Sequence, residues 1–162
     1  TGSLPTAANH DYGIVYDTDT NTIKYSDGTN WVGIPHNGTI TIELYNGGSD
    51  LTTGIKDVPI QVPYGATVVG WEIAAYDSSN ALLSTSIVVD ILSDTFANLP
   101  LIGTDSIAGT EKPTLSSAST ASDNTITTWS AITSGNYIQA EIESVTAGTK
   151  RVIVTIKVKK NS

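Results

Sequence analysis

Residues 66–93 constrain the fold more than any other stretch of the chain, because apolar residues recur at every second position in each half of it. The alternating residues are Val69, Trp71, Ile73 and Ala75 in the first half, and Ile87, Val89 and Ile91 in the second. A polar cluster, residues 77–80, separates the halves and favours a reversal of the chain. Alternation with a period of two is typical of a strand with one buried face. The stretch therefore predicts a long β-hairpin whose Trp71 side is covered by a second sheet or by a partner subunit.

Further segments of the same kind recur along the chain, separated by turn clusters rich in Gly, Asn, Ser and Pro. Besides the two halves of the hairpin (67–76 and 86–92), the expected strands are residues 39–45, 56–62, 125–129, 137–143 and 151–159. Short strands at this spacing predict an all-β fold, an antiparallel β-sandwich of the jelly-roll or another Greek-key type. The residues expected in its core are Trp71, Ile73, Ile87, Val89, Trp129, Val154 and Ile156.

The N-terminal part differs from this pattern. Residues 1–11 show no periodicity and are expected to form an extended arm, whereas residues 12–34 fit three very short strands in a β-meander. Three strands of this length hardly make a core of their own, so the meander should lean on a neighbour. The aromatic residues expected to contact that partner are Tyr12, Tyr16, Tyr25 and Trp31. A turn-like segment, residues 35–38, predicts a division into residues 1–36, an arm and meander for attachment, and residues 37–162, the jelly-roll-like sandwich.

The strand pattern breaks over residues 94–124, which we call the excursion. Its Gly and Pro residues argue against a continuous helix or a central strand, and long irregular segments in small domains are often functional. The excursion is therefore expected to be a loop that contacts either the host or an adjacent subunit. Its candidate exposed residues are Phe96, Asn98, Thr110 and Lys112.

Composition narrows the classes of partner. The chain has a formal net charge of -8 and no cysteine, and an acidic body argues against nucleic-acid binding. The apolar runs are too short to span a bilayer, so no membrane insertion is expected. Most basic residues lie after Thr149, which fits either lysines on the solvent face of a last strand or a docking strip for an acidic neighbour.

Candidate sites for chemistry are weak throughout. The two histidines, His10 and His36, lie in polar flanks that are poor places to build a catalytic triad. The spacing of residues 17–21 imitates the start of an EF-hand loop but lacks its glycine and its final glutamate, so an Asx-rich turn is expected there. We predict no enzyme activity, no cofactor and no metal.

Carboxylate pairs leave one enzymatic alternative open. Glu141 and Glu143 share a strand face, and the predicted hairpin would place Glu72 near Asp90, so a glycosidase pair is conceivable. Acids on the solvated face of an acidic protein are the more ordinary explanation.

Two segments resemble parts of bacteriophage proteins. The motifs SIVVDI (86–91), DTFANLP (94–100), KPTLS (112–116), Trp129, Ser134-Gly135-Asn136 and the terminal RVIVTIKV strand (151–158) are similar to a domain of bacteriophage tail-fibre and other virion structural proteins, over roughly residues 55–160. Separately, residues 4–34 are similar to a short module found near the ends of phage fibres. The chain departs from the first pattern at Leu92, where an aromatic residue is usual, and at Asn136, where Asp is usual. Neither departure touches a chemical role, because the resemblance implies no catalytic residues.

The resemblance implies a non-enzymatic protein on the virion surface, either on a tail fibre or on the capsid exterior. A fibre-tip or receptor-binding module is the first expectation, a capsid decoration or cement protein is the alternative, and a glycan-active enzyme is a distant third. Expected partners are two further copies of the chain in a homotrimer, other phage virion proteins, and a host surface glycan or protein. Because the sequence contains no methionine, both a processed chain and a fragment of a longer protein stay open.

Overall fold

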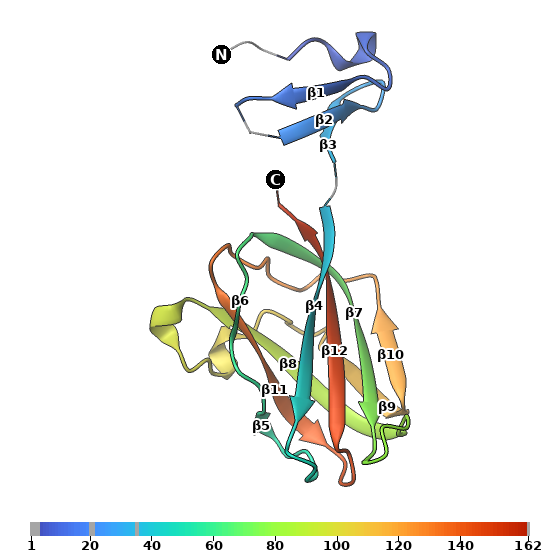
Figure 1. Cartoon of the computed structure of the whole chain (residues 1–162), viewed down its shortest axis with the longest axis vertical. Coiled ribbons are helices and arrows are strands. Elements are labelled where there is room, and N and C mark those ends of the chain that lie inside the picture. Colours follow the sequence, from blue (N-terminus) through green and yellow to red (C-terminus); the bar gives the residue numbers. More distant parts are fainter. Residues whose placement is uncertain (1–3, 20–21, 35, 162) are drawn as a thin grey trace. The chain divides into compact units, whose positions relative to one another are not determined.

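The computed structural model describes residues 4–19, 22–34 and 36–161, and it confirms the all-β, antiparallel architecture. The chain divides into two compact units, of which the first ends at His36 and the second spans Asn37–Asn161 (Figure 1). The described residues include no helix that is both long and apolar enough to cross a membrane.

The first unit is a small antiparallel sheet preceded by one 3-10 turn. Its elements are η1 (Ala7–Asn9), β1 (Ile14–Asp17), β2 (Thr22–Ser26) and β3 (Trp31–Gly33), and the strands pair in the order β1-β2-β3. The turn between β2 and β3 is held by Asp27, whose carboxylate accepts the backbone N–H groups of Thr29 and Asn30, while Gly28 supplies a positive φ. The three expected strands are present.

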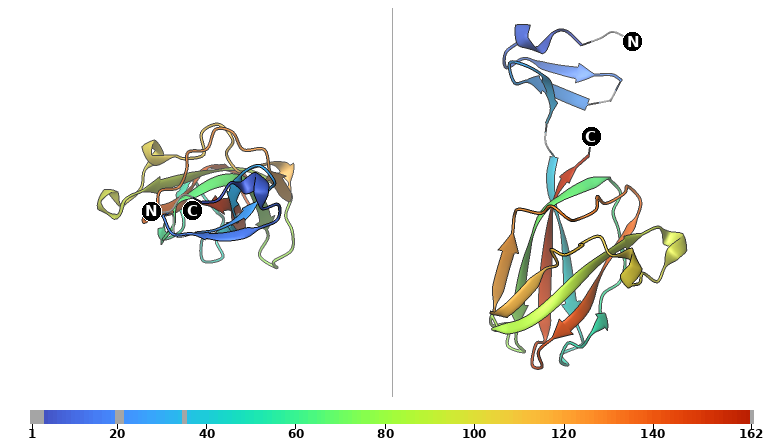
Figure 2. Two further views of the ribbon diagram at one scale, coloured as in Figure 1. Left: turned by 90° about the horizontal axis from the view of Figure 1, so that it is seen from above. Right: turned by 180° about the vertical axis from the view of Figure 1, so that it is seen from behind.

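The second unit is a sandwich of two antiparallel sheets. Its strands are β4 (His36–Tyr45), β5 (Gly54–Ile55), β6 (Ile60–Gln61), β7 (Ala66–Tyr76), β8 (Thr85–Asp94), β9 (Thr114–Ala118), β10 (Thr120–Asp123), β11 (Tyr137–Val145) and β12 (Arg151–Lys160). One sheet, here called sheet I, has the order β10-β7-β12-β4, and the other, sheet II, has the order β5-β11-β8-β9, with β6 also paired to β11 (Figures 1 and 2).

The pairing is nested along the chain, which makes the sandwich a jelly roll. The first strand lies beside the last (β4 and β12), the short β5 and β6 beside β11, β7 beside β10, and β8 beside β9. Apart from β5 to β6 and β8 to β9, every connection in the sandwich carries the chain from one sheet to the other.

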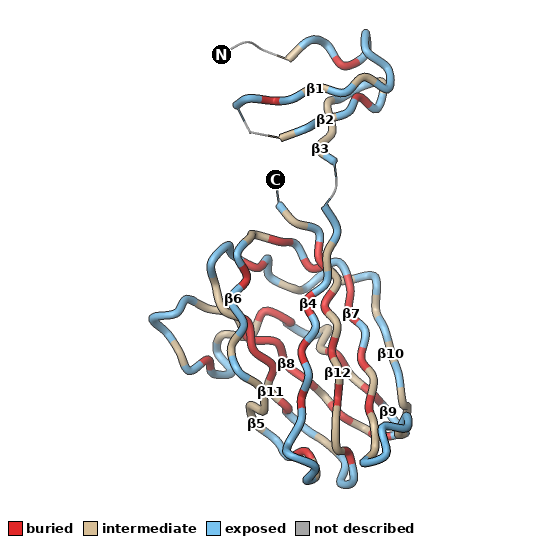
Figure 3. The backbone as a smooth tube through the Cα atoms, viewed as in Figure 1, coloured by how far each residue is buried: buried red, intermediate tan, exposed pale blue. Residues whose placement is uncertain are grey.

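The core lies between the two sheets, and buried residues alternate with more exposed ones along long strands such as β4, β7 and β12 (Figure 3). The predicted core residues Trp71, Ile73, Ile87, Val89, Val154 and Ile156 are all buried there, and Trp129 is partly buried at the edge of the same cluster. Val69 is an exception to the alternation we expected, since a bulge in the pairing of β7 with β12 places Val68 inward and leaves Val69 exposed.

The predicted hairpin over residues 66–93 is wrong in its pairing. Both strands exist, but β7 belongs to sheet I and β8 to sheet II, so their inner faces meet across the core instead of forming one sheet. The chain does begin a hairpin after β7, since Leu82 bridges to Tyr76 and the N–H of Leu83 donates to the carbonyl of Ala75. It then crosses to the other sheet. Alternation reveals which face of a strand is buried, and it does not reveal the neighbour to which the strand is hydrogen-bonded.

Three other sequence-based expectations were wrong. The excursion contains β9 and β10, besides the 3-10 turns η2 (Phe96–Asn98) and η3 (Gly103–Asp105), whereas the strand expected at 125–129 is absent from the described structure. Of the strand expected at 56–62, residues Ile60–Gln61 form β6, and β5 (Gly54–Ile55) precedes the expected range. Because β9 and β10 are edge strands that bury few apolar side chains, they carry no clear alternation.

Candidate functional site

The small N-terminal sheet has one face covered by the chain's own N-terminal arm. The indole Nε1 of Trp31 donates to the carbonyl of Pro5, the Ser26 hydroxyl donates to the carbonyl of Ala7 at 2.8 Å, and the His10 ring stacks on Trp31. The arm, which was expected to be extended, instead forms the turn η1 and is bonded to the sheet in the described residues 4–10. Trp31, predicted to contact a partner, is instead half-buried beneath this arm.

The other face of the sheet, which we call the open face, is apolar and exposed. Its residues are Ile14 and Tyr16 of β1, Ile23 and Tyr25 of β2, and Val32 and Ile34 in and after β3. The register places Ile14 opposite Tyr25, Tyr16 opposite Ile23, and Tyr25 opposite Val32, so these side chains share one face. Ile14 is 71% exposed, and Tyr12, at the approach to β1, is 86% exposed.

The first unit has almost no hydrophobic interior. Among its described residues, Ala7 is the one apolar residue that is fully buried, and the other buried residues are Asp17 and Ser26. Asp17 forms an ion pair with Lys24 at 2.6 Å. A three-stranded sheet without an apolar core is marginal in water.

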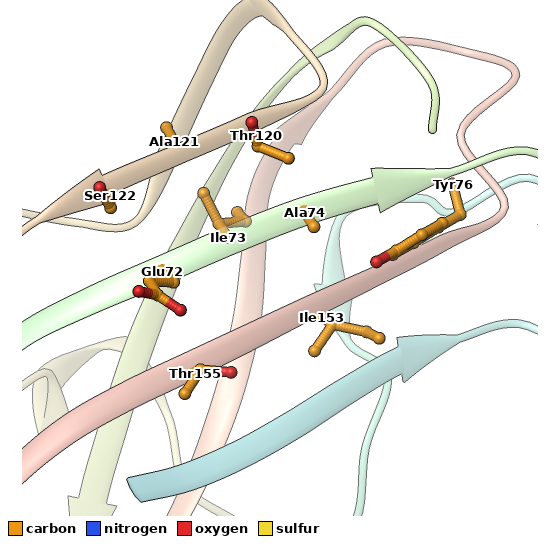
Figure 4. Close-up of a pocket in the computed structure, with 9 residues that line it drawn as sticks. All are labelled: Glu72, Ile73, Ala74, Tyr76, Thr120, Ala121, Ser122, Ile153 and Thr155. Carbon is orange, nitrogen blue, oxygen red and sulfur yellow. The ribbon is translucent and has the colours of Figure 1, made fainter. Parts of the chain in front are cut away.

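A second candidate surface is a groove on the outer face of sheet I (Figure 4). The groove has a volume of about 560 Å³ and is lined by Glu72, Ile73, Ala74, Tyr76, Thr120, Ala121, Ser122, Ile153 and Thr155. It forms because Ala74 is a small outward residue between two larger ones, Glu72 and Tyr76, on the same strand. Tyr76 extends from β7 across β12, while Thr120 and Ser122 line the opposite side from β10.

The charged groups around the groove are paired with one another. Lys157 Nζ lies 2.6 Å from Glu72 Oε1 and also donates to Asn124, and Arg151 pairs with Glu43 at 2.7 Å. The basic side chains of the predicted C-terminal strip therefore lie on the solvent face of β12 and pair largely with groups of the same chain. The groove has polar and apolar walls but little net charge.

The predicted exposed residues of the excursion divide into two groups. Phe96, Asn98 and Thr110 are exposed, with the Phe96 ring 5.6 Å from that of Tyr137. Lys112 is not an exposed loop residue, because its ammonium is held by two carboxylates. The bulk of the excursion is anchored to its own sandwich through Leu101, Ile107, Ala108 and Leu115, all of which are buried.

The carboxylates that suggested a glycosidase pair lie elsewhere than expected. Asp90 is opposite Glu141 on sheet II and is not a neighbour of Glu72, which lies on sheet I. Asp90 is only 2% exposed, accepts the Ser106 hydroxyl at 2.7 Å and pairs with Lys112 at 2.9 Å. Lys112 also binds Glu143, and this contact, together with Asp90, raises the pKa of the lysine. The network ties the excursion to the sheet.

Glu111 is a structural hub that sequence reasoning missed. Its carbonyl accepts the indole N–H groups of both Trp71 (3.0 Å) and Trp129 (3.1 Å), while its carboxylate accepts the backbone N–H and hydroxyl groups of Thr127 and Thr128. Those backbone N–H groups, Thr128 first, lower the pKa of Glu111 to about 2. A single acid among polar neighbours gives no sequence signal for this role.

Asp57 was missed as well. It lies in the break between β5 and β6, where its carboxylate accepts the N–H of Ala140, and Gln139 donates to the Asp57 carbonyl at 2.9 Å. The side chain thus replaces the strand partner that β11 lacks at this point. Burial raises the pKa of Asp57 to about 6. The sequence signal was Pro59, which is incompatible with a continuous strand.

The described residues contain no cluster of three or more His, Cys, Asp or Glu side chains that could hold a metal ion. In the EF-hand-like segment, Asp17 accepts the N–H of Asp19 at 3.0 Å, as an Asx turn does, and Asn21 lies outside the described residues. His10 packs on Trp31 and His36 begins β4, so they belong to different elements.

Comparisons with known proteins give one distant likeness. No family model matches the chain, and no curated protein matches it. Among solved structures, a chain of a cyanophage Pam1 capsid asymmetric unit is similar over 77% of this chain and 84% of that chain, with 13% sequence identity and a TM-score of 0.39. A likeness of this degree does not place the chain in a family.

Proposed function

We propose that the chain is a non-enzymatic structural protein of the bacteriophage virion surface, attached through the open face of its N-terminal unit. The observation that carries the proposal is the combination of an exposed apolar face with a unit that buries only one apolar residue, Ala7, among those described. A unit of this kind gains its stability by burying the face against a neighbour. The jelly roll, with its own complete core, is then the part that projects from the site of attachment.

The motifs that resemble phage virion proteins support the same role. The likeness to a cyanophage capsid chain is compatible with it but is too distant to add support. Within this role, the receptor-binding module of a fibre tip is the primary candidate, because the jelly roll offers a groove on one exposed sheet face. The alternative within this role is a decoration protein of the capsid. Copy number per particle distinguishes the two, since a decoration protein occurs in far more copies than a fibre.

The open face carries no charged side chain, whereas the whole chain has a net charge of -8. An uncharged apolar surface lets copies of an acidic protein meet without placing like charges against one another. We therefore include the homotrimer in the proposal, with three open faces packed around the symmetry axis.

The test is to make the open face polar without altering the jelly roll. Ile14→Asn with Ile23→Asn should abolish incorporation into phage particles and convert the trimer to a monomer in analytical ultracentrifugation. Val58→Asn is the matched control, because Val58 is 77% exposed on the second unit and lies outside the face. Wild-type occupancy of particles by the double variant would overturn the attachment role.

A further inference from the structure

We propose that the groove on sheet I binds an uncharged oligosaccharide through the juxtaposition of Tyr76, Glu72 and the hydroxyls of Thr120 and Ser122. The inference names the ligand class for a receptor-binding module, and in that sense it rests on the proposed function.

The shape of the groove fits a ligand of a few sugar rings. Its volume of about 560 Å³ lies within the range of roughly 300–1,000 Å³ that is usual for small-ligand sites. Ala74 leaves the hollow open between Glu72 and Tyr76, and Ile153 on β12 is the direct pairing partner of Ala74 (Figure 4). The floor stands on β7 and β12 at the centre of sheet I, and the wall with Thr120 and Ser122 stands on the paired edge strand β10, so the site is held by regular strands.

The polar groups of the groove are available to a ligand. No hydrogen bond from the hydroxyls of Tyr76, Thr120 or Ser122 to another described residue is present, and the Thr155 hydroxyl has only a long contact of 3.5 Å with Thr41. A hydroxyl can both donate and accept a hydrogen bond, as sugar hydroxyls do. The hydroxyls of the groove can therefore act as donors or as acceptors toward a carbohydrate. Tyr76 adds an aromatic ring with a polar tip, a combination suited to a ligand with apolar and hydroxylated sides.

Charge distinguishes a neutral sugar from other ligands. Glu72 bonds Lys157 through Oε1, which leaves Oε2 to accept a sugar hydroxyl in a charge-assisted hydrogen bond. The pair is neutral as a unit, and the chain around it is acidic, with a pI near 4.4. Phosphorylated, sulfated or uronic glycans would meet repulsion from this field. A protein partner would need a large apolar centre on this face, but the apolar floor at Ala74 and Ile153 is small and is bordered by Glu72 and the hydroxyls.

The experiment uses the intact chain and a panel of neutral oligosaccharides of three to six hexose or N-acetylhexosamine units, with sulfated and phosphorylated counterparts. Binding is detected by saturation-transfer NMR and its affinity measured by calorimetry. We expect at least one neutral oligosaccharide to bind and the charged counterparts to bind more weakly. If no neutral oligosaccharide binds, or the charged ones bind better, the inference is overturned.

Location is tested by filling the groove. Ala74→Phe, or Ser122→Phe on the edge strand β10 if the first variant folds poorly, should weaken binding at least about tenfold. Thr120→Ala should weaken it about three- to tenfold, the usual effect of one lost hydrogen bond. Val69→Phe is the matched control, because Val69 is 40% exposed on the same strand and does not line the groove. Binding that survives both filling variants would overturn the assignment to this site.

The two proposals fail separately. Ala74→Phe should leave incorporation into particles unchanged, since the groove lies on the second unit. Loss of sugar binding with normal incorporation supports the groove as a receptor site, whereas sugar binding by a chain that never enters particles would overturn the virion role and leave the ligand assignment in place.

Discussion

The jelly roll buries its apolar residues in a core, whereas the N-terminal unit exposes most of its apolar residues on one face. In the jelly roll, alternate residues of both sheets meet in one continuous core that is closed from solvent. In the N-terminal unit, the apolar residues of the open face point to solvent, and Ala7 is the one fully buried apolar residue described there. The first region is stabilised by its own interior, and the second depends on what covers it. An exposed apolar face of this kind is typical of a surface that another molecule covers, which is the role we propose for it.

The largest expected effect lies in the core of the jelly roll. Trp71→Ala should lower the free energy of unfolding by about 3–5 kcal/mol, because it leaves a cavity and also removes a hydrogen bond to the Glu111 carbonyl. Chemical denaturation measures the loss. A cost below about 1 kcal/mol would show that the two sheets are not packed as described.

Asp57 provides a smaller effect that depends on pH. Its pKa of about 6 in the folded protein lies above the value of 3.8 for an unperturbed aspartate, so the folded state binds the proton more tightly than the unfolded state. Its contribution to stability is complete below pH 3.8 and is lost as the pH rises through 6. The full difference in pKa corresponds to roughly 3 kcal/mol, and partial exposure to water reduces it to about 1–2 kcal/mol.

Asp57→Asn should therefore stabilise the protein at pH 8 and flatten the dependence of stability on pH between 4 and 7. The amide oxygen of the asparagine still accepts the Ala140 N–H, so the segment between β5 and β6 should keep its conformation. Denaturation curves at several pH values check this. An unchanged pH dependence in the variant would rule out Asp57 as its source.

The contribution of Glu111 to stability should have the opposite dependence on pH. Its pKa is lowered to about 2 from 4.5, so its contribution is present above pH 4.5 and is lost as the pH falls through 2. Glu111→Gln keeps the carbonyl that the tryptophans use but replaces one acceptor oxygen by a donor, and it should lower the melting temperature at pH 7 modestly. At pH 2 the variant and the wild type should converge; a constant difference would contradict the role of the charge.

The smallest effect belongs to the N-terminal unit. Ile14→Ala should change the stability of the isolated monomer by no more than about 0.5 kcal/mol, because Ile14 is 71% exposed there. The same type of truncation at Ile156, which is fully buried, should cost about 2–5 kcal/mol. Denaturation below the concentration of association compares the two. Equal costs would remove the contrast between the units.

The sequence predicted the features that depend on one strand at a time. Inward residues such as Ile73 and Val154 were identified because burial of one face imposes a period of two. The pairing of β7 and β8 was not predictable in this way, because both a hairpin and two facing sheets bury the same residues. β9 was missed because only Leu115 is fully buried in it.

The candidate sites show the same division. Tyr16 and Tyr25 of the open face were predicted from the period of two in their strands. Trp31 instead lies on the other face, beneath the arm. The groove could not be predicted, because it combines residues of β7, β10 and β12 that only the nested topology brings together. The local sequence pattern determines which face of a strand is buried, whereas the pairing of distant strands determines which residues come together in a site.

The most direct test of the central claim is hydroxyl-radical footprinting of intact phage particles, read by mass spectrometry. The account predicts that Ile14 and Tyr25 of the open face are protected in particles, while Val58 and Phe96, at 77% and 71% exposure on the second unit, are modified. Modification of Ile14 and Tyr25 as strongly as Val58 and Phe96 would show that the open face is uncovered in the virion and would contradict the account.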